Sequence, residues 1–289
     1  MISLKDVLRE AREGHRAIGH FNISDTVTLK AIFQSAKKFG VPVLIGVSEG
    51  ERSFIGTREA AVLVRSLREE HDFPIYLNAD HTHSADKIKE AVAAGFDAVL
   101  FDGGKLSFEE NIAQTKAVVE YVKSKNPNIL VEGELGYIGS SSEIFDKLPE
   151  GAAIRPEDLT KPEDAARFVR ETGVDLLAPA VGNVHGMFKN APNPRLDIER
   201  IRMICEISGV PMVLHGGSGT SDDDFRAAIT AGVSIIHINT EIRLAWKEGL
   251  AAGLAEHPNE VAPYKLLEKA LDKVSEVVYN RLTLFSRKS

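Results

Sequence analysis

Eight short apolar segments recur along the chain, and the stretches between them carry apolar residues at a helical period. Nearly continuous apolar runs separated by roughly 25 to 40 residues of helical pattern are typical of buried parallel strands joined by crossover helices. The pattern therefore predicts an α/β fold with eight strands. The expected strands are residues 17–22, 42–48, 74–81, 98–102, 129–134, 174–180, 210–215 and 233–239.

Eight such units favour a closed (β/α)8 barrel, or TIM barrel. This fold takes about 250 residues and carries its chemistry at the carboxyl ends of the strands. The competing architecture, a doubly wound open sheet, usually has fewer strands and a glycine-rich dinucleotide loop after the first. No such loop follows residue 22. With 289 residues and no low-complexity linker, we expect a single domain over residues 1–289, with 257–289 as a C-terminal helical extension.

The composition argues against several classes of partner. The net charge of −7 is spread along the chain, without the basic cluster that a nucleic-acid surface needs. The amino terminus lacks the apolar core of a signal peptide, and no run reaches the length of a membrane span. The single cysteine, Cys205, lies in a helical apolar pattern, which excludes an intrachain disulfide and indicates a buried structural thiol. We expect a cytoplasmic protein that binds neither nucleic acid nor membrane.

Three histidines, His81, His185 and His215, fall at or just beyond predicted strand ends. Because the carboxyl ends of barrel strands meet at one mouth, these side chains are expected to converge there. Three imidazoles with an open fourth position are a common arrangement for catalytic zinc, which polarises a substrate oxygen. A lone histidine at such a position is more often structural, so the prediction of a zinc site depends on all three.

Carboxylates occupy neighbouring strand ends. In the simplest interpretation, one or two of them orient the metal-binding histidines through hydrogen bonds. The residues concerned are Asp80, Asp102, Glu132 and Glu134.

Two further loops are suited to a phosphate group. Residues 215–221 and 239–241 each run directly into a predicted helix, and the first is rich in glycine. Glycines let backbone N–H groups approach an anion, and the helix amino terminus adds favourable partial charge. A glycine-rich turn alone usually only reverses the chain, but the loops after strands seven and eight are the usual phosphate site of this barrel.

The segment 137–156 combines serines, prolines and glycines with weak periodicity, which indicates a long loop after the fifth strand. Long loops in compact domains often act as lids over an active site.

Five motifs together resemble the class II, zinc-dependent ketose-bisphosphate aldolases, a family that cleaves fructose or tagatose bisphosphate. They occur in the family's order and span nearly the whole chain. The motifs are Asn-Ala-Asp-His at 78–81, Glu-Gly-Glu-Leu-Gly at 132–136, Gly-Asn-Val-His-Gly at 182–186, Leu-His-Gly-Gly-Ser-Gly at 214–219 and Asn-Thr-Glu at 239–241.

The resemblance implies a role for each matched residue. The catalytic Zn²⁺ would be bound by His81, His185 and His215, with Asp102 and Glu134 available to a second metal or a monovalent cation. Asp80 would exchange a proton with an oxygen of the second substrate. The phosphate of dihydroxyacetone phosphate would be held by Gly186, Gly216, Gly217, Ser218, Asn239 and Thr240, and the other half of the sugar would face Asn22 and Ser48.

The chain departs from the family at two catalytic positions. His237 stands where the family usually has an asparagine that helps to hold the enediolate. It could donate a similar hydrogen bond, add a titratable group or be a core histidine, and we favour the hydrogen bond. The family's proton-abstracting glutamate follows Gly-Gly, whereas here three serines, 140–142, precede Glu143. Glu143 is the candidate for that role if the loop adjusts.

Three other functions are alternatives to this family. A Schiff-base aldolase needs a lysine at a strand end, and no predicted strand ends in one. A barrel-type zinc hydrolase would use a His-x-His pair such as His81 and His83, but usually after the first strand. A non-catalytic sugar-phosphate-binding protein would not need a metal site beside an acid such as Asp80.

We therefore expect reversible cleavage of a ketose 1,6-bisphosphate, with fructose 1,6-bisphosphate preferred and its tagatose epimer as the alternative. A basic residue should meet the distal phosphate, and the candidates are Arg281, Arg287 and Lys288 in the C-terminal region. The resemblance also implies a homodimer or homotetramer.

Overall fold

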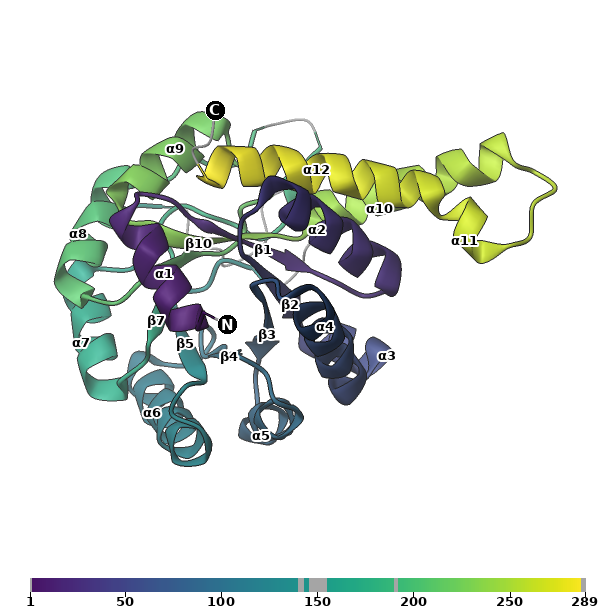
Figure 1. Cartoon of the computed structure of the whole chain (residues 1–289). Helices are drawn as coiled ribbons and strands as arrows, with labels where there is room; N and C mark the ends of the chain where they lie inside the picture. The colour runs from purple at the N-terminus through teal and green to yellow at the C-terminus, as the bar shows by residue number, and fades with distance from the viewer. Residues whose placement is uncertain (1, 140–142, 146–154, 190–191, 287–289) are drawn as a thin grey trace.

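The chain folds into a closed barrel of eight parallel strands, in the order β1-β10-β9-β7-β5-β4-β3-β2 (Figure 1). The computed structural model describes residues 2–139, 143–145, 155–189 and 192–286. All eight predicted strands are confirmed. They are β1 (Ile18–Asn22), β2 (Val43–Val47), β3 (Ile75–Thr82), β4 (Ala98–Phe101), β5 (Leu130–Leu135), β7 (Leu176–Pro179), β9 (Met212–Leu214) and β10 (Val233–Ile238).

Helices connect the strands and surround the barrel (Figure 1). Local interactions set where the helices begin: Ser107 and Glu110 form a capping box at α6, and Pro162 lies in the first turn of α7. The helices are α1 (Leu4–Glu13), α2 (Thr26–Phe39), α3 (Glu49–Ile55), α4 (Thr57–His71), α5 (Ala85–Ala94), α6 (Phe108–Lys125), α7 (Pro162–Thr172), α8 (Ile198–Ser208), α9 (Asp222–Ala231), α10 (Thr240–Glu256), α11 (Pro263–Leu266) and α12 (Glu268–Ser286).

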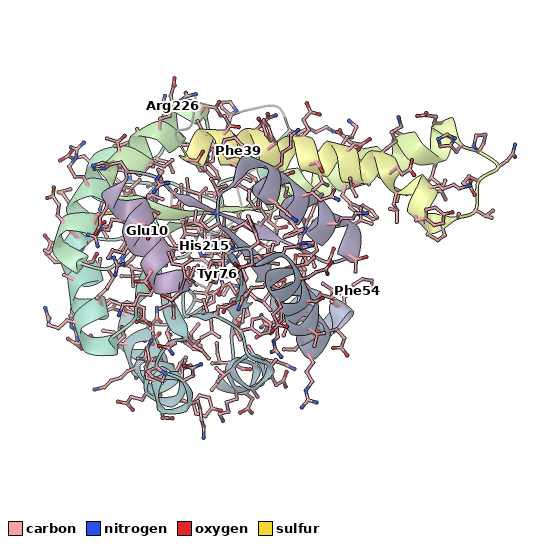
Figure 2. All side chains as sticks on the ribbon, viewed as in Figure 1. Glu10, Phe39, Phe54, Tyr76, His215 and Arg226 are labelled. Atoms are coloured by element: carbon pink, nitrogen blue, oxygen red, sulfur yellow. The ribbon has the colours of Figure 1, made fainter. Side chains whose placement is uncertain are left out.

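Strand side chains alternate between the barrel interior and the surrounding helices, which creates two separate apolar cores. The larger core lies between the strands and the helices. The smaller one fills the amino-terminal half of the interior, where Leu44 and Tyr76 pack with Leu8 of α1. Figure 2 shows Tyr76 and His215 inside the ring of helices, whereas Arg226 lies at its outer edge.

The other half of the interior is polar. Its side chains come from β1, β3, β5 and β10, each two residues further along its strand than the apolar layer. They are at most 4% exposed: His20, Asn78, Glu132 and His237. Room for His20 depends on Gly46 of β2, where a Cβ atom would lie 2.1 Å from the imidazole Cε1. Burying polar groups costs free energy unless they are paired, so this layer indicates a functional site above the apolar plug.

The C-terminal helices form a hairpin. Figure 1 shows α10 running outward from the barrel and α12 returning beside it, with α11 near the tip. α12 packs against α2, α9 and β1, and its residues Leu282 and Phe285 belong to the outer core. The expected extension therefore includes the helix that closes the ring between α9 and α2.

The segment 137–156 differs from the plain loop that was expected, because it contains a short strand. β6 (Ile144–Phe145) pairs in parallel with β8 (Met187–Phe188). A two-residue strand has no periodicity that a sequence could reveal, since the pairing depends on a distant segment. Residues 140–142 and 146–154 lie outside the described part of the chain, and the lid remains a prediction.

Cys205 on α8 is buried, as expected, and burial raises the pKa of its thiol to about 11. Among the described residues, no helix has the length and apolar character needed to cross a membrane.

Candidate active site

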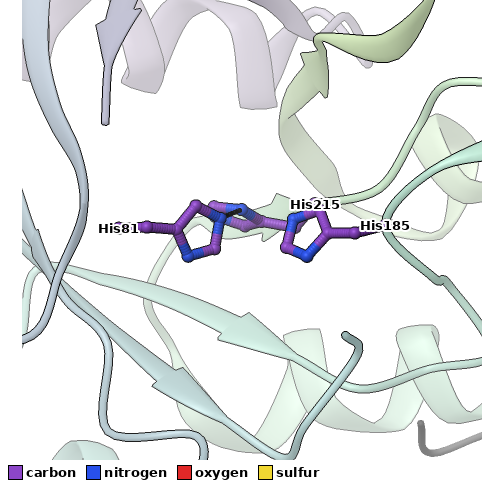
Figure 3. Close-up of side chains that lie close together, drawn as sticks. All are labelled: His81, His185 and His215. Atoms are coloured by element: carbon purple, nitrogen blue, oxygen red, sulfur yellow. Dashed lines mark hydrogen bonds between the residues drawn. The ribbon is translucent and has the colours of Figure 1, made fainter. Parts of the chain in front are cut away.

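Three histidine rings meet at the carboxyl-terminal mouth of the barrel. Each of His81, His185 and His215 offers a ring nitrogen within 4.8 Å of those of the other two. Figure 3 shows His81 entering from one side and His185 from the other, with His215 beside them. His81 has a φ of +31°, a strained conformation for a non-glycine residue and one that often marks functional sites.

Each histidine is oriented by a hydrogen-bond partner on its far side. The Nδ1 of His81 lies 2.8 Å from Asp102 Oδ2, and the Nε2 of His215 lies 2.7 Å from Glu132 Oε1. The Nδ1 of His185 lies 2.7 Å from the carbonyl oxygen of Gly139. In neutral rings these nitrogens carry the hydrogen, since their partners are acceptors. The opposite nitrogens therefore have lone pairs directed at the shared space.

This donor set fits a metal ion. The two inward nitrogens of His81 (Nε2) and His215 (Nδ1) are 3.1 Å apart. Tetrahedral zinc with Zn–N bonds of about 2.0–2.1 Å separates its ligand atoms by about 3.3 Å. Burial lowers the pKa of His185 to about 3, which keeps that imidazole in the neutral form that metals bind. Outer partners that fix each ring are the usual accompaniment of metal-binding histidines.

Two carboxylates extend the metal-binding potential of the site. His81, Asp102 and Glu134 also form a group whose ligand atoms lie within 4.8 Å of one another. Burial, reinforced by nearby Asp102, raises the pKa of Glu134 well above its usual value. Burial would raise that of Asp102 too, but the hydrogen bond with His81 outweighs it and lowers the Asp102 pKa to about 2. A second cation could thus be held beside the first.

Asp80 lies next to the metal-binding group and is 3% exposed. Burial favours its neutral form, but the charge of protonated His81 and the adjacent His237 ring outweigh burial and hold the Asp80 pKa well below its usual value. Its Oδ2 accepts a hydrogen bond of 2.8 Å from Asn22 Nδ2, and its Oδ1 lies 3.5 Å from His237 Nδ1. The carboxylate is therefore ionised and positioned to accept a proton.

His237 lies inside the barrel rather than in the outer core. Its ring stacks on that of His20 and is tilted against that of His215, with centroids 3.4 Å and 3.8 Å away. Burial holds its pKa well below the usual value, so the ring is neutral. Its Nε2 has no hydrogen-bond partner among the described residues, and the residue lines the active-site cavity. Its role as a hydrogen-bond donor remains a prediction.

The loops expected to hold phosphate meet on one side of this cavity. Five of the six predicted residues line it: Gly186, Gly216, Ser218, Asn239 and Thr240. Gly217 instead braces the loop by donating its N–H to the His237 carbonyl at 3.1 Å. A side chain at Gly216, which has a φ of +61°, would place its Cβ 2.3 Å from the Val184 carbonyl oxygen. The loop can therefore approach the mouth this closely only with glycine.

The remaining predicted residues take different positions. Ser48 and Asn22 both line the cavity. Glu143 is exposed, and its carbonyl accepts a hydrogen bond of 2.9 Å from Met187 N, two residues from His185. Arg281 does not line the cavity, because its guanidinium pairs with Glu241 at 2.8 Å and Asp222 at 3.0 Å. Arg287 and Lys288 lie outside the described residues.

Sequence reasoning assigned no role to several residues that shape the site. His20 is stacked on His237, and Asn193 donates to the carbonyls of Gly186 and Ser218, which ties two phosphate loops together. Glu51 accepts hydrogen bonds from Asn22 and from Ser48 N. Glu51 had one usable signal, because Ser48 and Glu51 have capping-box spacing directly after a strand. His20 and Asn193 have no comparable local signal.

The fold and the site define a (β/α)8-barrel enzyme with a candidate metal centre at its mouth. The sequence profile of the family described as "Fructose-bisphosphate aldolase class-II" matches residues 2–289. The chain therefore belongs to the class II fructose-bisphosphate aldolase family, and it is a lyase.

Individual relatives agree with this assignment. The chain is 34% identical to a fructose-bisphosphate aldolase of Geobacillus stearothermophilus over 99% of its own length and 96% of the relative's. It is also 34% identical to a 6-phospho-5-dehydro-2-deoxy-D-gluconate aldolase of Bacillus licheniformis, over 98% and 94% of the two chains. The crystal structure of the YdjI aldolase from Escherichia coli K12 superposes with a TM-score of 0.80 at 28% identity, over 98% and 96%.

Proposed function

We propose that the enzyme reversibly cleaves fructose 1,6-bisphosphate into dihydroxyacetone phosphate and glyceraldehyde 3-phosphate, with zinc held by His81, His185 and His215. The observation that supports this most is the convergence of those three histidines beside ionised Asp80, with glycine-rich loops lining the same cavity. Bound zinc would act as a Lewis acid on the substrate's ketone and so favour the negative charge that develops there.

The chain's own groups carry the proton transfers. In the cleavage direction Asp80 accepts the proton of the C4 hydroxyl, the C3–C4 bond breaks, and C4 becomes the aldehyde carbon. The electron pair of that bond stays with the three-carbon fragment. There His237, in the tautomer that carries its single hydrogen on Nε2, donates a hydrogen bond to the developing enediolate. Glu143, brought in by its loop, delivers a proton to C3 and completes dihydroxyacetone phosphate.

Binding divides the substrate between two sides of the cavity. The backbone N–H groups of the Gly186, Gly216 and Ser218 loops, with the amino terminus of α10 at Asn239 and Thr240, hold the phosphate next to the ketone. Asn22 and Ser48 face the carbons beyond C3. Asp102 and Glu134 would hold a second metal or a monovalent cation beside His81.

Two other substrates are alternatives. Tagatose 1,6-bisphosphate differs from the fructose compound at one stereocentre, and the same groups would serve it. The second is 6-phospho-5-dehydro-2-deoxy-D-gluconate, because a relative named for that substrate is as similar as the one named for fructose bisphosphate, at 34% identity each.

The enzyme is further proposed to be cytoplasmic and to form homodimers or homotetramers. Val261 and Tyr264, at the tip of the helical hairpin, are 87% and 71% exposed, and apolar side chains gathered at a surface often mark subunit contacts. Light scattering would give the mass in solution, and a monomer would refute the assembly.

The decisive experiment is steady-state cleavage of the three substrates before and after EDTA treatment and zinc add-back, with metal content measured on the same samples. Activity that is lost with the metal and restored by zinc supports the proposal, and the relative kcat/KM values select the substrate. Full activity in metal-free protein would refute it.

A further inference from the structure

We propose that His20 is a positioning residue for the aldol cleavage. It acts through His237, whose ring it holds with Nε2 at the active-site cavity. This inference rests on the proposed function and deepens it, because it concerns a residue that none of the five motifs contains.

His20 does not reach the substrate cavity itself. Its side chain is completely buried, and the residues that line the cavity around Asp80 and His81 do not include it. His237, by contrast, lines the cavity. An effect of His20 on the reaction must therefore pass through a neighbour. That neighbour is His237, because the two rings stack with centroids 3.4 Å apart.

The His237 ring is enclosed between two other imidazoles. β10 lies between β1 and β9 in the barrel, so His20 on β1 and His215 after β9 approach the ring from opposite sides. His215 is tilted by 40° against it, with centroids 3.8 Å apart, whereas His20 is parallel within 5°. Full contact with a flat neighbour restricts rotation about the side-chain bonds. Without His20, the His237 ring can turn away from His215.

His20 is itself fixed by two other strands. Asn78 Nδ2 on β3 lies 3.2 Å from His20 Nε2. Gly46 on β2 leaves the space that the imidazole fills, since a Cβ atom there would lie 2.1 Å from His20 Cε1 and 2.6 Å from its Nε2. Burial lowers the pKa of His20 to about 3, so two neutral rings stack without charge repulsion. His20 can therefore support His237 without depending on it.

The free edge of His237 is the one that the proposed reaction uses. Asp80 Oδ1 lies 3.5 Å from its Nδ1, whereas its Nε2 has no hydrogen-bond partner among the described residues. A hydrogen bond from Nε2 to the developing enediolate depends steeply on distance and angle. Misplacement of a group by about 1 Å can lower a rate by about 100-fold. His20 should therefore affect turnover rather than substrate binding.

The first test is a double-mutant cycle on kcat with His20→Ala, His237→Ala and the double variant. His20→Ala should lower kcat by about 10-fold, change KM by less than about twofold and leave the zinc content unchanged. In the His237→Ala protein the same change should cost less than about twofold, because the ring that His20 positions is gone. Equal losses in the two backgrounds would overturn the inference.

A second cycle disturbs the support without removing it. Gly46 has no positive φ, so alanine there affects packing rather than the backbone. Gly46→Ala should lower kcat by about 10-fold, because its methyl group displaces the His20 ring. The added Cβ would also lie 3.1 Å from Asn22 Oδ1, but this contact is common to both backgrounds. In the His20→Ala protein the further loss should be smaller than about twofold, and an undiminished loss would contradict the inference.

Leu44→Ala is the matched control. Leu44 lies opposite His20 in the register of β1 and β2 and is 1% exposed in the smaller apolar core. Its truncation should lower the thermal unfolding midpoint, as His20→Ala does, but leave kcat unchanged. If kcat fell equally in Leu44→Ala and His20→Ala, general destabilisation would explain the loss and the positioning role would be refuted.

A nuclear magnetic resonance measurement separates this inference from the proposed reaction. In protein labelled with ¹³C-histidine, the nuclear Overhauser contact between the His237 and His215 rings should weaken in His20→Ala and persist in Leu44→Ala. A contact of full strength in His20→Ala would show that His20 does not hold the ring. A wild-type enzyme that cleaves none of the three substrates would instead refute the proposed reaction, and the ring contact would still decide whether His20 positions His237.

Discussion

His20 and His237 stack face to face inside the barrel, with ring centroids 3.4 Å apart and ring planes within 5° of parallel. They meet because β1 pairs with β10 in a register that sets His20 opposite His237. Asn78 Nδ2 lies 3.2 Å from His20 Nε2, and Asp80 Oδ1 lies 3.5 Å from His237 Nδ1. The His237 ring is therefore held by the His20 ring on one face and by the Asp80 carboxylate at one edge.

This fixed position leads to a prediction for His237. Replacing it with alanine should lower kcat by about 100-fold, the typical effect of removing one donor to a developing oxyanion. His237→Asn should retain more activity, since the amide is also a donor, and KM should change little in either variant. Steady-state kinetics on fructose 1,6-bisphosphate provides the test. Wild-type kcat in His237→Ala would show that the ring serves only packing.

The metal ligands can be tested through His215, which is 1% exposed at the centre of the histidine group. His215→Ala should abolish both zinc retention after dialysis and aldol cleavage, because two imidazoles hold zinc poorly without the third. Metal analysis and activity are measured on the same preparation. His257→Ala, at the exposed end of α10, is the matched control. A fully active His215→Ala enzyme would rule out the ligand assignment.

Glu132 should act on the metal through His215, whose Nε2 lies 2.7 Å away. Glu132→Gln keeps the size of the side chain but loses the charge that fixes the tautomer. Zinc affinity should fall by about 10- to 100-fold, as for other partners of metal-binding histidines. Competition with a chromophoric chelator measures the affinity, with Glu199→Gln on the exposed face of α8 as the control. An unchanged affinity would limit Glu132 to a packing role.

Cys205 should be unreactive in the folded protein. Burial raises the pKa of its thiol from 9.0 to about 11, so the reactive thiolate is scarcer than in the unfolded chain at every pH below that value. Alkylation by iodoacetamide at pH 8 should be slow in buffer and fast in guanidinium chloride. Raising the pH toward 11 should accelerate the reaction of the native protein. Mass spectrometry follows the modification, and rapid native labelling at pH 8 would contradict the buried position.

Much of the fold could be read from local pattern. Each of the eight strands is signalled by residues within a few positions of each other, and each appears where it was predicted. The pair β6 and β8 was missed, because Ile144–Phe145 is a strand only where Met187–Phe188 lies beside it.

The residues of the candidate site also fall into two groups: those that the local sequence pattern reveals and those that depend on distant segments. His81, His185 and His215 were identifiable because strand ends in a barrel converge, so that position along the chain predicts position in space. Arg243 was not, since its 2.8 Å contact with Glu51 joins the first turn of α10 to the first turn of α3, which are far apart in sequence. Arg281 was a reasonable candidate for phosphate until the structure paired it with Glu241 and Asp222.

The amino-acid sequence by itself determined the strand and helix periods, the barrel class and the residue types at the strand ends, because each of these depends on neighbours along the chain. Tertiary structure alone decided which nitrogen of each histidine faces the shared space, that His20 supports His237, and that Arg243 lines the cavity while Arg281 does not. Hydrogen bonds and ring contacts of this kind depend on angstrom-scale distances between residues far apart in sequence. Only the closed barrel sets those distances.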